Sequence, residues 1–193
     1  MFGNIKEVAN KYGMGGDWFK PEQGDNRVRV VSEFVDYGNH FDSVAKKSVI
    51  CTGSDTCPIC LKAIKSGTYQ DNKPKVQFLG YVIDRKDEKI KLYRMSWSVF
   101  NSLNELSIAA DYAFDGIPPY DITINRKGTT KNDTEYKVIA ARQNSELTED
   151  EMSKIAELKP IQAVLEDMIM KQGGEVEEYQ SEEEINANLQ AKK

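Results

Sequence analysis

The only histidine and all three cysteines of this 193-residue chain lie within 21 consecutive positions. They are His40, Cys51, Cys57 and Cys60, and the last two form a C-x-x-C pair. One imidazole nitrogen and three thiolates complete a tetrahedral zinc site, and four protein ligands leave no position for a substrate. Buried thiols with a surface histidine are the alternative, but this does not explain the clustering. The sequence therefore predicts a structural zinc site.

The remaining composition is that of a soluble globular protein. Hydrophobic residues make up 39% and charged residues 30%, which suits one domain with a tail or two small domains. No apolar run approaches the ~20 residues that cross a bilayer, and the first residues have no signal-peptide core. Three cysteines are an odd number for a disulfide scaffold, and thiolate ligands need reducing conditions. We therefore expect a cytoplasmic protein without membrane contacts.

The net charge of −5 hides an asymmetry along the chain. Residues 1–145 contain 21 Lys+Arg and 18 Asp+Glu, whereas residues 146–193 contain 5 and 13. A mildly basic body followed by an acidic end is common in proteins that bind nucleic acid and limit non-specific contacts. An acidic end that serves only solubility is the alternative. This alternative explains the acidic end equally well, but it does not explain the excess of basic residues in residues 1–145.

Alternating, β-branched segments predict a mainly β fold of five or six strands. They cover residues 27–35, 48–50, 75–84, 89–95, 120–125 and 134–142. Short helices are expected at 61–65 and from Ser96 or Ser98 to about Leu106. Strands joined by turns and interrupted by one helix favour a small, closed or partly open barrel.

Strand parity predicts which side chains face the core. In the first strand Val28 and Val30 would point inward, and Arg27 and Arg29 outward. In the hairpin 75–95, Val76, Phe78, Val82, Ile90 and Leu92 would point inward. Lys75, Gln77, Tyr81, Lys89, Lys91 and Tyr93 would then lie outside.

Changes in composition predict the domain boundaries. Residues 1–26 would form a flexible arm, in which Trp18 either anchors the arm or simply packs. The barrel core would span residues 27–146, with the zinc subdomain at 37–66. Thr148 caps a helix and Pro160 breaks it, so residues 147–172 would be short helices packed on the core. Residues 173–193 would be an acidic, disordered tail.

Catalysis is poorly supported by the residues present. The histidine and every cysteine are assigned to the metal, and no G-x-S-x-G or phosphate-binding loop occurs. Zinc nucleobase deaminases carry H-x-E and P-C-x-x-C motifs, but here Asp42 replaces the glutamate and Thr56 the proline. Cys51 would also fill the position of the catalytic water. We therefore expect a protein that is not an enzyme.

Cations and aromatic residues recur together on the expected outer faces, which is typical of single-strand binding. Cations follow phosphates and aromatic rings stack on unpaired bases, largely independent of sequence. Ordinary solvated faces with cross-strand tyrosines are the alternative. The candidate contacts are Arg27, Arg29, Tyr37, Lys46, Lys47, Lys73, Lys75, Tyr81, Lys91, Tyr93 and Arg94.

Several motifs resemble the single-stranded DNA-binding proteins of bacteriophages, such as the helix-destabilising protein of T-even phages. They are the zinc set, GDNRVRVVSEF at 24–34, FLGYVIDR at 78–85 and YDITI at 120–124. The resemblance covers roughly residues 20–170. It implies an OB-fold with a zinc-braced subdomain, a basic, aromatic-lined cleft, and an acidic tail that contacts replication proteins and masks the cleft. The ligand spacings are shorter than in the T-even protein, and the chain ends in Ala191-Lys192-Lys193.

We therefore expect a single-stranded DNA-binding protein of phage DNA replication, recombination and repair. It would coat and protect unpaired strands in the cytoplasm of the infected bacterial host. Its partners would be single-stranded DNA, further copies along the strand, and phage replication proteins through the acidic tail. The alternative is a zinc-braced protein-interaction or transcription-associated module whose working surface is the acidic end.

Overall fold

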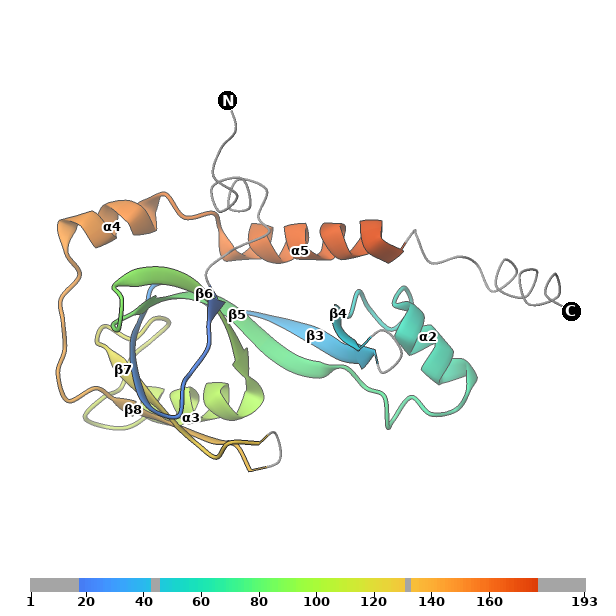
Figure 1. Cartoon of the computed structure of the whole chain (residues 1–193), viewed down its shortest axis with the longest axis horizontal. Coiled ribbons are helices and arrows are strands. Elements are labelled where there is room, and N and C mark those ends of the chain that lie inside the picture. Colours follow the sequence, from blue (N-terminus) through green and yellow to red (C-terminus); the bar gives the residue numbers. More distant parts are fainter. Residues whose placement is uncertain (1–17, 43–45, 131–132, 177–193) are drawn as a thin grey trace, which may run out of the picture. The chain divides into compact units, whose positions relative to one another are not determined.

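The computed structural model describes residues 18–42, 46–130 and 133–176 (Figure 1). The chain divides into two compact units. The described residues of the first unit run up to Tyr37 and from Val76 to Ile161, and those of the second cover Gly38–Lys75 and the residues from Gln162 on. No helix in these described ranges is both long and apolar enough to cross a membrane.

The first unit is built on a mixed sheet. Its strands are β1 (Trp18–Phe19), β2 (Gly24–Val30), β5 (Lys75–Asp84), β6 (Lys89–Ser96), β7 (Ile122–Lys127) and β8 (Glu135–Ala140). They follow the order β1-β6-β5-β2-β7-β8, with β1 parallel to β6 and the other neighbours antiparallel. Within the described residues this path is open, because no pairing joins β8 to the opposite edge. The mainly β class is confirmed; closure into a barrel is not seen.

The expected hairpin of residues 75–95 is present as β5 and β6. It pairs without interruption from Gln77 opposite Ser96 to Asp84 opposite Lys89. The turn closes because the backbone N–H of Glu88 donates to the carbonyl of Asp84 at 2.8 Å, with Glu88 in the left-handed region at φ 54°.

The core lies on one face of this sheet and is covered by α3 (Trp97–Ser107). Val99 and Leu103 of α3 are buried, and the hydroxyl of Ser102 accepts a hydrogen bond from the Val138 backbone N–H at 2.9 Å. The buried sheet residues of this core are Val28, Val30, Phe78, Val82, Tyr93, Met95, Ile122, Ile124 and Val138.

Strand parity is correct for β2 and for most of β5, but it is wrong for β6. The register places Tyr93 opposite Gly80 and Lys91 opposite Val82, so these odd-numbered residues share the core face. Tyr93 is therefore buried, and Leu92 lies on the opposite face. Lys91 lies at the end of the core face, where its ammonium pairs with Asp84 and Asp87. Val76 of β5, expected inside, is exposed.

Arg29 lies opposite the core as expected, but it is buried. Its guanidinium contacts the carboxylate of Asp121 at 2.8 Å, and it also hydrogen-bonds the side chain of Asn144 and the carbonyl of Ser145. The segment after β8 thus covers this end of the outer face. Parity assigns a residue to a face but cannot tell whether a distant segment covers that face.

The helix α4 (Glu149–Ala156) follows this segment, and its expected cap is confirmed. The hydroxyl of Thr148 accepts from the N–H of Glu151, and the Glu151 carboxylate accepts from the N–H of Thr148. Glu151 also accepts from Arg85 at 2.6 Å. Arg85 and Asp121 therefore connect α4 to the sheet.

The second unit contains α2 (Pro58–Lys65), α5 (Ile161–Val176), β4 (Lys47–Ile50) and most of β3 (Val35–Asp42). The side chain of Gln172 on α5 accepts from the N–H of Ile50 at 2.6 Å and donates to its carbonyl at 2.8 Å. It thus satisfies the backbone of β4 as a neighbouring strand would.

These elements change three expected boundaries. The zinc segment extends to residue 75, and α5 groups with it instead of with the barrel core. Strands already occupy 18–19 and 24–26 of the expected arm, while residues 1–17 lie outside the described part. The helix α5 continues to Val176, and the rest of the expected tail lies outside the described residues.

Candidate metal centre and sheet-face site

The four clustered residues meet in the second unit as a group that could hold a metal ion. Their ligand atoms lie within 4.8 Å of one another. The sulfur of Cys60 is 3.2 Å from Nε2 of His40 and 3.5 Å from the sulfur of Cys51. Bond lengths of ~2.0–2.3 Å to a tetrahedral ion put neighbouring ligand atoms about 3.5–3.8 Å apart. These two donor pairs thus already have nearly the spacing of a tetrahedral site.

Each ligand is positioned by regular structure. His40 lies on β3, and Cys51 follows β4, its N–H donating to the carbonyl of Gly38 at 2.8 Å. Cys57 is the N-cap of α2 and Cys60 lies in its first turn. The N–H of Cys57 donates to the carbonyl of Gly53 at 2.8 Å, which closes a turn directly before the C-x-x-C pair.

Gly38 is required by this arrangement. A Cβ on it would lie 2.9 Å from the Cβ of Pro74 and 3.1 Å from the Cβ of Cys51. Contacts this short force a neighbour to move. The close approach of β3 to the segment after β4 therefore depends on the missing side chain.

Without an ion, this environment opposes ionisation of the Cys60 thiol. Burial, followed by the hydrogen bond to Cys51 and the nearby Cys57 sulfur, raises the pKa of Cys60 to about 12. Burial also lowers the pKa of His40, although its hydrogen bond to the backbone of Asn72 acts in the opposite direction. A divalent cation reverses this effect on Cys60 because a coordinated thiol loses its proton. The neutral histidine is already in its ligating form, and the Asn72 contact orients the ring.

With four protein donors, three of them sulfur, the centre has the composition of a structural site. His40, Cys57 and Cys60 are buried, and Cys51 is partly exposed. The site can therefore stabilise the surrounding loop but leaves no coordination position for a reacting water.

The predicted nucleic-acid contacts divide between the two units. Lys46, Lys47, Lys73 and Lys75 lie in the second unit and are exposed, except for the half-buried Lys47. Arg29, Tyr37 and Tyr93 of the first unit are buried, and Lys91 is neutralised by its two carboxylate partners. Arg27 is half-buried, and its Nε lies 3.6 Å from a carboxylate oxygen of Asp121. Tyr81 and Arg94 are half-buried on the face opposite the core.

Around Tyr81 and Arg94 the sheet brings together a set of side chains that we call the sheet-face site: Trp18, Gln77, Tyr81, Leu92 and Arg94. Trp18 pairs with Leu92 across β1 and β6, and Leu92 pairs with Tyr81 across β6 and β5. These three residues therefore form one row, aromatic–aliphatic–aromatic, across three adjacent strands. All five side chains are half-buried.

Arg94 contacts Trp18 of the sheet-face site and the neighbouring Tyr37. Its guanidinium carbon lies 5.2 Å from the centre of the Trp18 ring, within the range of a cation–π contact. Burial raises the pKa of Tyr37, while Arg94 acts to lower it through its charge and a hydrogen bond. The Tyr37 hydroxyl also lies 3.0 Å from the Gln77 amide oxygen. The buried Nε of Arg94 has no hydrogen-bond partner in the described part of the chain.

Sequence reasoning missed Gln77 and Leu92 and left Trp18 undecided. Alternation in 75–84 was enough to place Gln77 beside Tyr81, but Leu92 was assigned to the core by the parity error in β6. A two-residue strand carries no sequence signal that would predict the pairing of Trp18 with Leu92, 74 positions later. Comparison with known proteins gives no further guidance, because no family model, curated protein or solved structure matches the chain.

Proposed function

We propose that this protein binds single-stranded DNA without catalysis, as a component of phage DNA replication and recombination. It holds the strand on the sheet-face site and uses structural zinc at His40, Cys51, Cys57 and Cys60. The five strands β2, β5, β6, β7 and β8, with α3 between the third and the fourth, are compatible with the partly open barrel of an OB-fold. We further propose that the protein acts in the cytoplasm of the phage-infected bacterial host.

The observation that carries the proposal is the row of Trp18, Leu92 and Tyr81 beside Arg94. Adjacent strands lie ~4.8 Å apart, so the two aromatic residues of the row are about 10 Å apart. Unpaired bases stack on such rings whatever their identity, and the guanidinium beside Trp18 matches a phosphate.

The charges along this part of the chain support an anionic ligand. Residues 72–83 and 89–104 contain five Lys or Arg and no Asp or Glu, although the whole chain has 31 acidic residues. These stretches form most of β5, β6 and the start of α3. A polyanion approaching the sheet-face site therefore meets little repulsion from these stretches, and Asp84 at the end of β5 is paired with Lys91.

The zinc-bearing unit supports the same function by its charge. Residues 38–75 contain six lysines and three aspartates, and Phe41 beside His40 is 62% exposed. Lysines follow phosphates and an exposed ring accepts a base. We propose that zinc stabilises the loops that carry these groups.

A titration with labelled oligo-dT at several salt concentrations tests the proposal. Binding is expected at micromolar concentrations or tighter and weakens steeply as salt rises. Indifference to oligo-dT at low salt would remove this function and favour the zinc-braced interaction module. Tighter binding to RNA or to duplex DNA than to oligo-dT would make that nucleic acid the proposed ligand in place of single-stranded DNA.

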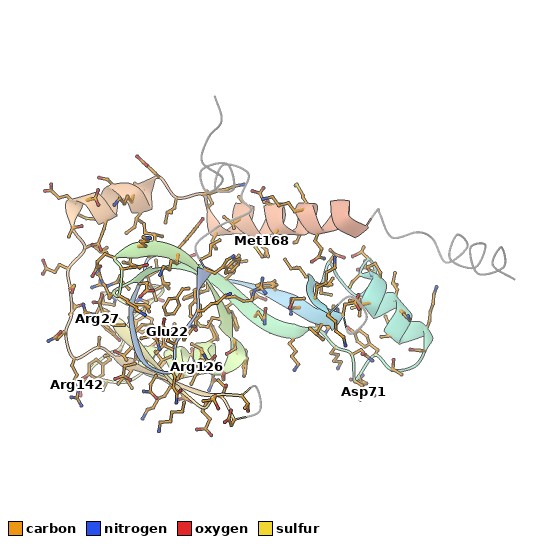
Figure 2. All side chains as sticks on the ribbon, viewed as in Figure 1. Glu22, Arg27, Asp71, Arg126, Arg142 and Met168 are labelled. Carbon is orange, nitrogen blue, oxygen red and sulfur yellow. The ribbon has the colours of Figure 1, made fainter. Side chains whose placement is uncertain are left out.

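Two substitutions locate the binding face. Tyr81→Ala should cost about 1–3 kcal/mol of binding free energy through the lost stacking platform. Arg94→Ala should also reduce the salt slope by roughly 0.7, the value for one phosphate contact to a single strand. Tyr112→Ala and Arg142→Ala are the matched controls, since both residues are exposed (Arg142 is labelled in Figure 2). Equal losses in the controls would show that the effect is not local.

A further inference from the structure

Trp97 is a second exposed tryptophan that the sheet-face site does not include. It is the first residue of α3, directly after Ser96 of β6, and it is 59% exposed. The chain contains two tryptophans, so Trp97 and Trp18 account for both. A large aromatic residue exposed to this extent at a helix start needs an explanation, because its burial would stabilise the fold.

The ring of Trp97 is supported by other aromatic rings on one side. Its centre lies 6.0 Å from the ring of Phe78 and 6.1 Å from that of Phe100. Phe78 and Phe100 are themselves stacked, with centres 3.8 Å apart and planes inclined by 7°. Phe78 is nearly buried in the core, so this stack gives the tryptophan a rigid base.

Trp97 lies near one end of the β5–β6 hairpin. Phe78, on which it packs, points to the core face, whereas the neighbouring Gln77 points to the face of Arg94 and Tyr81. From Leu92 to Ser96 the distance along β6 is about 13 Å at ~3.3 Å per residue. A strand bound along the sheet-face site toward Gln77 and Ser96 would therefore reach Trp97 at the end of the hairpin.

We propose that Trp97 is a second stacking platform, which takes an unpaired base of the same bound strand as the strand passes the end of the hairpin. This rests on the proposed single-strand function and extends its site. The choice of a nucleic acid over a protein occupant follows from the charge around it. Trp97 lies inside the acid-free stretch 89–104, and residues 72–83, which cover β5 except for its last residue Asp84, add two lysines and no acidic residue.

Each tryptophan can report separately. Trp18→Phe leaves Trp97 as the emitter, and Trp97→Phe leaves Trp18. Both variants are titrated with dT4 and dT16, which span the range of ~4–16 nucleotides per OB-fold site. We expect dT16 to quench both tryptophans, and dT4, if it occupies the sheet-face site, to quench Trp18 more strongly than Trp97. Trp97 emission unchanged at saturating dT16, with Trp18 quenched, would overturn the inference and leave the proposed function intact.

An affinity measurement tests the energetic role. Trp97→Ala should weaken dT16 binding roughly 5- to 150-fold, with a much smaller effect on dT4. Ile108→Ala is the matched control, since Ile108 is 77% exposed at the other end of α3. An equal loss in Ile108→Ala, or no loss in Trp97→Ala, contradicts the proposal. If neither tryptophan responds to any oligonucleotide, the proposed function itself fails. Trp97 emission that changes with protein concentration without DNA would instead identify a second copy as the occupant.

Discussion

Asp121 should be the most sensitive polar residue of the first unit. Its side chain is fully buried and faces the guanidinium groups of Arg29 at 2.8 Å and Arg85 at 3.3 Å. It also accepts from the backbone N–H of Ser145 at 3.2 Å. Asp121→Asn keeps the volume but removes the charge, so Arg29 loses its carboxylate partner while Arg85 retains Glu151.

Breaking a buried pair by removing one partner costs about 3–5 kcal/mol. For a protein of ~150–250 residues, 1 kcal/mol corresponds to ~2–4 °C in Tm. Asp121→Asn should therefore lower the Tm of the first unit by roughly 6–20 °C, as measured by circular dichroism or calorimetry. Asp111→Asn is the matched control at an exposed position and should leave Tm unchanged. A decrease below about 2 °C in Asp121→Asn would refute the view that this carboxylate holds the segment after β8 on the sheet.

Three further predictions concern the cap of α4 and the metal centre. Burial opposes ionisation of Glu151, but the Thr148 backbone and Arg85 lower its pKa below the ordinary 4.5. The contribution of the Glu151 carboxylate to the free energy of unfolding is therefore present above pH ~4.5 and is lost as pH falls through the lower folded-state pKa. Glu151→Gln should lower the free energy of unfolding by about 2 kcal/mol at neutral pH. In urea unfolding, the difference between the wild type and this variant should shrink in acid. Gly38→Ala places a Cβ 3.1 Å from that of Cys51. It should weaken zinc affinity roughly 10-fold or more in a chelator competition. Zinc affinity equal to that of the wild type would show that β3 and the segment after β4 can move apart without disturbing the metal site. Removing zinc should weaken oligo-dT binding while the circular dichroism of the sheet persists, and unchanged affinity would show that the zinc-bearing unit is separate from the binding surface.

The sequence was most informative where the determinants are local. The four metal donors cluster within 21 positions, and the spacing of Cys57 and Cys60 already fits one turn at the start of α2. The hairpin of β5 and β6 and the capping box at Thr148 are likewise set by neighbouring residues.

The features that were missed depend on residues far apart in the chain. Arg29 is buried because it pairs with Asp121, 92 positions later, and because Asn144 and Ser145 of the segment after β8 cover it. The grouping of α5 with the metal centre depends on Gln172 bonding to Ile50 across 122 positions. Long-range pairing of this kind leaves no periodic signal in the sequence. The parity error in β6 has a local cause, because alternation alone permits either face and the hairpin register with β5 decides between them.

The most direct test of the central claim is photo-crosslinking of the wild-type protein to an oligo-dT that carries bromodeoxyuridine, with the attachment sites identified by mass spectrometry. The account predicts crosslinks at Trp18 and Tyr81, which disappear when unlabelled oligo-dT competes. Crosslinks confined to other parts of the chain, or none at an oligonucleotide concentration that saturates binding, would contradict the assignment of the sheet-face site.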